Sequence, residues 1–405
     1  MKFIHTSLAL RSFLCRFALL SLIAVPFSPQ ASAQEKPATP APDVIIFKNG
    51  DQLTGKFERS IGDTISFKSD AVGEVTVPLD KVKELHSASN FVVIKKDEKI
   101  TREPKAASPV AFEDSNIQEL LPNAAPVSVP LKEVGYVIDG ATYNKELTAN
   151  PGFFRGWDGA ITGGATVLQA TSFGQTFTLG VSLIRLIPTV AYLPPRTRTT
   201  LNVLETYGKL TQPQFPLPTF CNGSKTPPGC ADSVAKTSIF HADFEHDKYL
   251  TPRFYLLGDL AFDHNYAQGL DFQQLYGFGA GYTVLKTPVH QFDVKSDIHY
   301  QRQNFFQFPP PQISSTNQNL IGSTFGEAYK RILPGKILFT QSGTYIQSWN
   351  NTEAWQAIGA FGLALPVYHR FSLSVNFLDN YLNNPAIGFN KNSMQFVTGV
   401  TYTLH

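Results

Sequence analysis

From about residue 155 to the C-terminus, apolar and polar side chains alternate along the chain in long runs. The clearest run sets Phe292, Val294, Ser296, Ile298 and Tyr300 against Asp293, Lys295, Asp297, His299 and Gln301. Successive side chains of a β-strand point to opposite faces, so one face of this segment is largely apolar while the other carries charges and amides. The pattern predicts strands that have one face suited to lipid.

Turn signals separate the C-terminal region into a series of such runs. We predict strands at residues 155–170, 174–187, 197–211, 235–248, 253–266, 270–285, 290–304, 318–332, 336–349, 353–365, 370–382 and 392–404. Every second connection is a tight turn, such as Thr251-Pro252 or Pro334-Gly335, and longer segments such as 212–234 lie between them. Single-chain bacterial barrels have an even number of strands, with short periplasmic turns alternating with longer outer loops. We therefore predict an all-β fold, an outer-membrane antiparallel β-barrel of about twelve strands over residues 155–405. A soluble sandwich is disfavoured because its strands average about six residues.

The first 42 residues read as a targeting segment and a tether. Basic residues precede an apolar run from Phe17 to Val25, and Ala31-Ser32-Ala33 follows it, which is the composition of a cleavable signal peptide over residues 1–33. The run is shorter than the roughly 20 residues that a membrane-spanning helix needs. Residues 34–42 are rich in Pro and Ala and form a tether.

Residues 43–100 predict a small periplasmic β-module, SH3-like or Sm-like, of about five strands. The strands are expected at 43–48, 52–58, 64–68, 74–77, 81–85 and 91–95, with a tight hairpin at Asn49-Gly50-Asp51. Residues 101–154 lose this periodicity and gain Pro, Ala and acidic residues. We expect them to form a linker with one strand at about 133–138.

Composition narrows the class of protein further. Aromatic residues make up 12% of the chain and charged residues 16%, as expected when outward faces meet lipid and inward faces carry amides and hydroxyls. The net charge of +2 gives no electrostatic sign of binding to nucleic acid or to anionic lipid, and on this ground we set both aside as partners. Cys221 and Cys230 flank a loop of Gly, Pro and Ser, and in an oxidising envelope compartment they predict a disulfide. Free thiols or a metal pair are the alternatives, although no second His or Cys pair lies nearby.

Titratable side chains gather on the polar register of the predicted strands. The candidate lumen residues are His241, Asp243, Glu245, Asp259, Asp263, Asp293, Lys295, Asp297 and His299. Barrel interiors are polar, and opposite charges there most often pair with one another, so a structural or cation-attracting lining is expected. A lumenal hydrolase site around Asp297 and His299 is the alternative. A lipase would need Ser and His together on a lipid-facing strand, and we find no His-x-Ser pair there.

No phosphate loop, zinc spacing or nucleophile elbow occurs, so we expect no catalytic residues, cofactor or metal. The Gly277-x-Gly279-x-Gly281 run has a period of two and indicates small residues facing the lumen.

Two regions resemble a known family, the YdiY-like salt-induced outer-membrane proteins or DUF481. The first is the run from Val44 to Gly55 with the turn Ala71 to Val75, and the second is Gly156-Trp157-Asp158-Gly159-Ala160. The resemblance implies a periplasmic head followed by an outer-membrane barrel, and it implies no reaction.

These observations together predict a non-enzymatic protein of the Gram-negative outer membrane. Its expected role is a narrow cation-preferring channel, or an envelope structural protein under osmotic stress. The expected partners are outer-membrane lipid and the barrel-assembly machinery, with peptidoglycan or a periplasmic protein on the N-terminal module.

Overall fold

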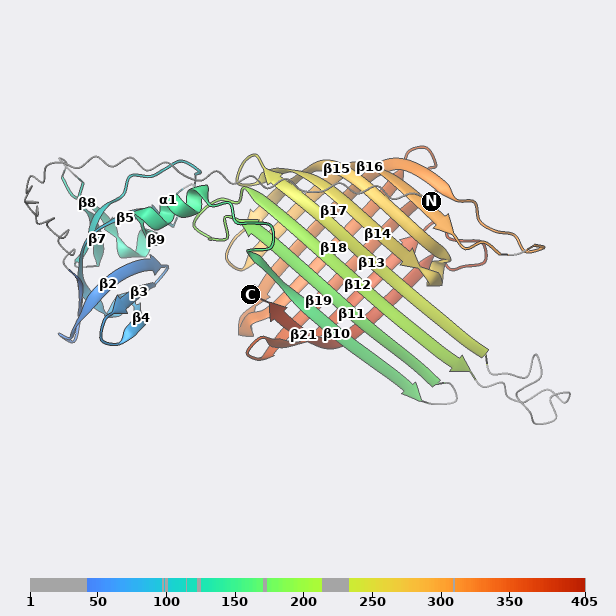
Figure 1. Cartoon of the computed structure of the whole chain (residues 1–405), viewed down its shortest axis with the longest axis horizontal. Helices are drawn as coiled ribbons and strands as arrows, with labels where there is room; N and C mark the ends of the chain where they lie inside the picture. The colour runs from blue at the N-terminus through green and yellow to red at the C-terminus, as the bar shows by residue number, and fades with distance from the viewer. Residues whose placement is uncertain are drawn as a thin grey trace, which may run out of the picture. The chain divides into compact units, whose positions relative to one another are not determined.

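The computed structural model describes residues 42–404 apart from 97, 99–100, 114, 122–124, 170–172, 213–232 and 309. It is almost entirely β-structure, with an N-terminal sheet and a closed barrel (Figure 1). The predicted signal peptide, most of the tether and the Cys221–Cys230 pair lie outside the described residues. Among the residues described, no helix is long and apolar enough to cross a membrane.

The barrel is closed by pairing of its last strand with its first, and all neighbours are antiparallel. Its strands are β10 (Trp157–Gln169), β11 (Phe173–Ile187), β12 (Thr197–Gln212), β13 (Ser233–Tyr249), β14 (Phe254–Asn265), β15 (Leu270–Lys286), β16 (His290–Phe305), β17 (Gln318–Leu333), β18 (Ile337–Ser348), β19 (Trp355–Tyr368), β20 (Phe371–Leu382) and β21 (Asn392–Leu404). The predicted twelve-stranded antiparallel barrel is thus confirmed.

The largest shift of a strand boundary is at β19, which continues through Pro366 to Tyr368, where a turn was expected. The pairing with β20 is irregular between Pro366 and Tyr368, and such a bulge tolerates a proline that cannot donate to the ladder.

Strand register decides which side chains face outward, because directly paired residues share a face. Tyr276 pairs with Tyr300 and Phe278 with Ile298, and all four side chains are exposed. Across the closing strands, Phe361 pairs with Phe377, which pairs with Phe396. The outer surface of the barrel therefore carries the apolar and aromatic belt of a membrane-spanning barrel.

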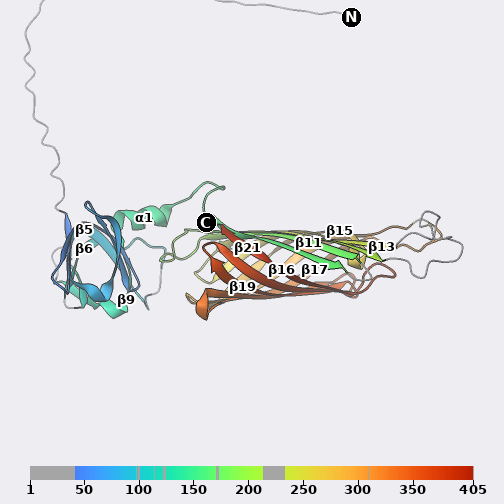
Figure 2. The same ribbon diagram turned by 90° about the horizontal axis from the view of Figure 1, so that it is seen from below.

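The N-terminal module consists of a sheet of strands β1 to β9 and the helix α1, which follows β9. Its elements are β1 (Asp43–Phe47), β2 (Gln52–Ile61), β3 (Thr64–Ser69), β4 (Gly73–Pro78), β5 (Val82–Lys95), β6 (Ser108–Glu113), β7 (Asn116–Glu119), β8 (Val127–Pro130), β9 (Val134–Asp139) and α1 (Gly140–Thr148). Strand β9 pairs with both β2 and β5, while β1 lies between β2 and β5, so these four strands close a small barrel. Figure 2 shows α1 beside this sheet.

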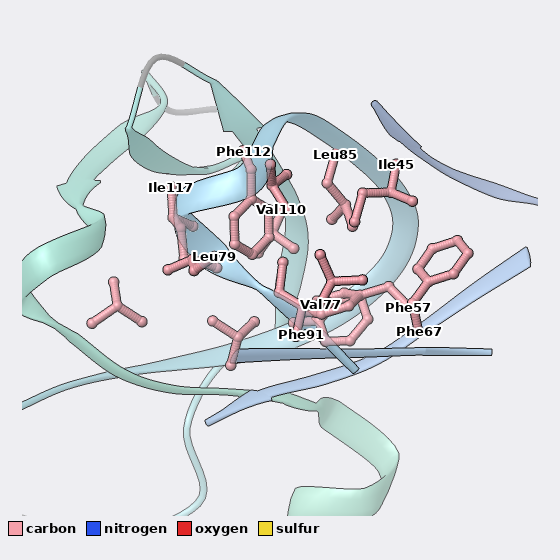
Figure 3. Close-up of a cluster of buried hydrophobic side chains, with 14 of the residues drawn as sticks. Ile45, Phe57, Phe67, Val77, Leu79, Leu85, Phe91, Val110, Phe112 and Ile117 are labelled. Carbon is pink, nitrogen blue, oxygen red and sulfur yellow. The ribbon is translucent and has the colours of Figure 1, made fainter. Parts of the chain in front are cut away.

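The core of the N-terminal module forms around a group of phenylalanine rings (Figure 3). Phe57 lies 4.6 Å from Phe91 and 5.6 Å from Phe112 between ring centroids, the latter edge to face. Fully buried Ile45, Ile65, Phe67, Leu85, Val110, Ile117 and Val137 surround them. Aromatic pairs of this kind add about 0.5–1.5 kcal/mol each beyond the area that they bury.

The main difference from the predicted fold lies at residues 101–154, where a linker was expected and the structure has strands and a helix. The strand expected at about 133–138 is present as β9, but β6, β7 and β8 precede it, and Phe112 and Ile117 enter the same core as Phe57. These strands are only four to six residues long, too short to show a clear period in the sequence. Asp139 caps the N-terminus of helix α1, because its carboxylate accepts a hydrogen bond from the Thr142 amide at 2.9 Å.

The strands expected at 81–85 and 91–95 are one continuous strand, β5. Its register with β6 shifts between Ser87 and Asn90. This bulge interrupts the alternation that a sequence pattern would follow.

Candidate functional site

The inner face of β12 to β16 gathers the charged side chains of the barrel. Register places Arg198 opposite Asp247, Glu245 opposite Asp259, and His241 opposite Asp263. On β16, Asp293, Lys295, Asp297 and His299 alternate with the outward Val294, Ser296 and Ile298. All the candidate lumen residues named from the sequence therefore face the barrel interior.

Arg198 holds three carboxylates together at one end of this charged wall. Its Nε donates to Asp247 Oδ2 at 2.6 Å and its Nη1 donates to Asp293 Oδ2 at 2.8 Å. Its Nη2 lies 3.8 Å from Glu245 Oε1, and Lys295 Nζ donates to the other oxygen of Glu245. The side chain of Arg198 is 9% exposed and that of Asp247 is 1% exposed. This corner of the lumen is filled by a cluster of three carboxylates and two cations.

Two tyrosines pack on the same guanidinium. The Tyr255 ring centroid lies 4.9 Å from the guanidinium carbon of Arg198, and that of Tyr249 lies 5.9 Å away. Tyr249, Tyr255 and Leu257 are buried together. A desolvated cation on an aromatic ring adds to the stability of such a cluster.

The glycines of β15 make room for side chains of the neighbouring strand β14. A Cβ on Gly281 would lie 2.2 Å from the Tyr255 ring, and one on Gly277 would lie 2.3 Å from an oxygen of the Asp259 carboxylate. The alternating glycines therefore mark inward positions where larger groups from β14 lie directly over the backbone.

A second group of polar contacts runs across β11 to β16. His241 bridges two carboxylates, with Nδ1 at 2.6 Å from Asp263 Oδ1 and Nε2 at 2.9 Å from Asp243 Oδ1. Asn202 Nδ2 donates to Asp243, and Gln273 Nε2 donates to Asp263. Both ring nitrogens of His241 are therefore engaged by protein groups.

Asp297 and His299 form a closed couple on β16. Their Oδ1 and Nδ1 atoms are 2.9 Å apart, and the His299 side chain is 0% exposed. The Thr324 hydroxyl lies 3.1 Å from the same nitrogen of His299. A solute in the lumen does not reach this couple.

The opposite wall of the lumen is built from small and hydroxyl-bearing residues. It borders a cavity of about 510 Å³, lined there by Ala160, Thr162, Gly180, Ser182, Ala328, Thr340, Ser342, Ala360, Gly362 and Asn376. Asp293, Lys330 and the larger apolar residues Ile184, Leu204 and Leu378 also line this cavity. The barrel interior thus combines a charged, filled side with a small-residue side that leaves space.

The sequence interpretation missed Arg198 and Asp247, although they are central to the charged cluster. Arg198 lies in the hydroxyl-rich run Thr197 to Thr200, which gives little contrast between faces. Asp247 is placed inward by the same period of two as Glu245, and this parity is the signal that could have found it. Within the described part of the chain, no group of three or more His, Cys, Asp or Glu side chains could hold a metal ion.

Comparison with solved structures finds other barrels at low sequence identity. The beta domain of the Bordetella autotransporter BrkA is 11% identical and covers 61% of this chain and 98% of its own, with a TM-score of 0.31. An outer membrane channel from Pseudomonas putida F1 is 8% identical and covers 63% of this chain and 100% of its own, also with a TM-score of 0.31. The translocator domain of the autotransporter NalP from Neisseria meningitidis is 11% identical and covers 61% of this chain and 86% of its own, with a TM-score of 0.30. None of the curated proteins matches the chain.

One family model matches the chain, over residues 223–404. This range covers β13 to β21, whereas the motifs quoted above lie before it, in the N-terminal module and at the start of β10. The match therefore comes from the barrel strands, and it agrees with the resemblance carried by the motifs. Over these residues the chain matches the family described as protein of unknown function, DUF481.

Proposed function

We propose that this protein is an outer-membrane barrel that passes small hydrophilic solutes, with a preference for cations, through a narrow lumen. The observation that carries the proposal is the cavity of about 510 Å³, which is bordered by the small-residue wall and by Asp293 of the charged wall. A barrel whose only need was a filled interior would have large side chains on both walls. Here small residues such as Ala360, Gly362 and Ser342 keep one side free.

The preference for cations follows from the charges on the inner face. The acidic side chains are Asp243, Glu245, Asp247, Asp259, Asp263, Asp293 and Asp297, against the cations Arg198, Lys286 and Lys295 in the same wall and Lys330 beside the cavity. Clefts lined by one sign of charge concentrate counter-ions. An excess of carboxylates therefore favours cations in the water beside this wall.

Planar-bilayer recording of the refolded full chain tests the proposal. We expect discrete conductance, and a reversal potential displaced toward the cation equilibrium potential in a salt gradient. Ser342→Trp, on the inner face of β18, should lower the conductance because its ring occupies the cavity. Ser342→Lys should move the reversal potential toward that of the anion.

Tyr345→Trp is the matched control, because Tyr345 lies on the outer face of the same strand. It should leave conductance and selectivity unchanged. A folded wild-type protein without conductance over a range of salt concentrations would overturn the channel proposal and leave an envelope structural role under osmotic stress.

The alternative of a lumenal hydrolase finds little support in the geometry. His299 is fully buried with Asp297, and both nitrogens of His241 contact carboxylates, so neither imidazole has a free nitrogen facing a water-filled space. The decisive variant is Asp297→Asn combined with His299→Ala. If hydrolysis of lipid or peptide were detected and lost in this variant, the lumenal site would return as the explanation.

The same proposal places residues 1–33 as a cleaved signal peptide and the N-terminal module in the periplasm. The even strand number supports it, because the barrel then begins and ends on the side of the short turns. Outer-membrane lipid and the barrel-assembly machinery are the partners that this location implies. Peptidoglycan or a periplasmic protein could dock on the module near Lys48, Lys56 and Lys68, and a pull-down with the full chain and a triple Lys→Ala variant tests this.

A further inference from the structure

The outward face of the barrel carries a compact polar group on three adjacent strands. Glu205 on β12 pairs with Phe240 on β13, which pairs with His264 on β14, so the three share one face. Ser238 is two residues from Phe240 and faces the same way. His241 and Asp263, next to them in sequence, face the lumen. Glu205, Ser238 and His264 therefore lie on the lipid side of the barrel wall.

The three side chains contact one another closely. Ser238 Oγ lies 2.8 Å from His264 Nε2 and donates a hydrogen bond to Glu205 Oε1 at 2.6 Å. His264 Nε2 lies 3.9 Å from Glu205 Oε2. The side chains of His264 and Glu205 are 24% and 37% exposed, so they remain within reach of an external molecule. A hydroxyl beside an imidazole nitrogen is the arrangement that nucleophilic catalysis needs.

The position of this group along the strands suits a lipid interface. His264 is next to the last residue of β14 and Ser238 lies near the start of β13, at the barrel end opposite the Leu250–Arg253 turn. With short turns on the periplasmic side, this is the level of the outer leaflet. Ionisable groups on the lipid side of a barrel are unfavourable, and one that persists in a membrane protein points to a functional site.

An apolar groove lies directly beside Glu205. It has a volume of about 420 Å³, and its outward-facing lining residues are Gly163, Ala165, Phe177, Leu179, Glu205 and Tyr207, with Gly164 and Thr178 between them. A Cβ on Gly163 would meet nothing within 4 Å, so the floor of the groove is open. Apolar walls with one polar end match an acyl chain whose ester lies at the polar group.

Two lysines lie on the same face, beyond Ser238. Lys209 and Lys236 are directly opposite each other in the pairing of β12 and β13, and both are exposed. Like charges directly opposite are destabilising in a sheet. An anionic headgroup between them would relieve this repulsion and would hold a lipid with its acyl ester near Ser238.

We propose that Ser238, His264 and Glu205 form an esterase site that hydrolyses an acyl ester of an anionic lipid held in the outward groove. Ser238 Oγ attacks the ester carbonyl carbon while His264 Nε2 takes the hydroxyl proton. The Glu205 carboxylate stabilises the imidazolium that forms. Before the attack, the Ser238 hydroxyl rotates so that its proton points to His264 Nε2 and no longer to Glu205. The bond to the leaving oxygen breaks, and the imidazolium protonates it to give a free alcohol and an acyl-Ser238 ester.

The second half of the reaction uses water. His264 Nε2 takes a proton from a water molecule whose oxygen attacks the acyl-Ser238 carbonyl. The acyl–Oγ bond breaks, Oγ regains the proton, and a free fatty acid leaves. This activity lies on the face of the wall opposite to the lumen, so it goes beyond the proposed channel function and does not depend on it. The nucleophile and the base come from different strands, so no His-x-Ser pair in the sequence would mark them.

Covalent labelling of the refolded full chain tests the nucleophile. A fluorophosphonate probe should add to Ser238, as located by peptide mass spectrometry. Ser238→Ala should abolish the adduct, and His264→Asn should slow labelling by about 100-fold or more, within the range that a general base contributes. Ser296→Ala, on the outward face of β16, is the matched control and should label like the wild type.

Release of fatty acid identifies the lipid. Phosphatidylglycerol in mixed micelles and lipopolysaccharide are compared, and Ser238-dependent release from one of them assigns the acyl source. A heat-modifiable gel shift verifies that each variant is folded. If a variant does not fold, labelling of the wild-type protein at Ser238 decides whether this serine is the nucleophile. A folded wild type that takes no label at Ser238 would overturn the proposal, as would hydrolysis that persists in Ser238→Ala.

Discussion

Arg198→Met offers the sharpest test of how the barrel interior is stabilised. The guanidinium is the partner of Asp247 and Asp293 at 2.6 and 2.8 Å, in a corner where the Asp247 side chain is 1% exposed. Methionine fills a similar length of chain but leaves these carboxylates without their cation. Breaking a buried ion pair by removing one partner destabilises a protein by about 3–5 kcal/mol, because an uncompensated charge remains. The lost contact with the Tyr255 ring acts in the same direction.

The assay is urea unfolding of the barrel refolded into lipid vesicles, followed by tryptophan fluorescence. The chain has three Trp, and Trp157, Trp349 and Trp355 lie in or next to barrel strands, so the signal reports on the barrel. We expect the free energy of unfolding to fall by about 3–5 kcal/mol. Lys330→Met, at an exposed position on the inner face, is the control and should change it little.

A double variant separates charge from packing. Arg198→Met combined with Asp293→Asn should be less destabilised than the sum of the two single variants, because the second change removes one of the unpaired carboxylates. A loss below about 1 kcal/mol for Arg198→Met would equal that of an exposed ion pair and would refute the view that this corner is dry and tightly paired.

Three further predictions concern other parts of the chain. Gly281→Val should prevent Tyr255 from packing, because a Cβ at this position lies 2.2 Å from the ring, and the heat-modifiable fraction after refolding should drop. Gly258→Ala is the control and should refold normally, because a Cβ there meets nothing within 4 Å. Burial raises the pKa of Glu119 in the N-terminal module, so its contribution to stability is present at acidic pH and is lost as pH rises through the raised pKa. Glu119→Gln should therefore stabilise the module at neutral pH and flatten its pH profile, and an unchanged profile in thermal unfolding would contradict this. The intact mass of the protein from outer membranes should correspond to a chain beginning at Gln34. Cys221 and Cys230 should be alkylated only after reduction, and alkylation of either thiol in the unreduced sample would exclude the disulfide.

The barrel was predictable because its signal is local and repeated. A period of two over a dozen or more residues identifies each strand and its lipid-facing side, and this held for β15, where Phe278 faces outward and Gly279 inward. Strands of the N-terminal module such as β7, with four residues, are too short for that signal. Ile117 of β7 belongs to the same core as Phe57 and Phe91, which are distant in sequence.

The sequence by itself determined the strands, their two faces and therefore the barrel, because alternation is a property of consecutive residues. Only the tertiary structure decided which polar residues meet. Arg198 reaches Asp293 across 95 positions of sequence, and Ser238 meets His264 and Glu205 only because three strands align in one register. Register between strands is fixed by closure of the whole barrel and by packing on both of its faces, so no single segment of the chain contains that information.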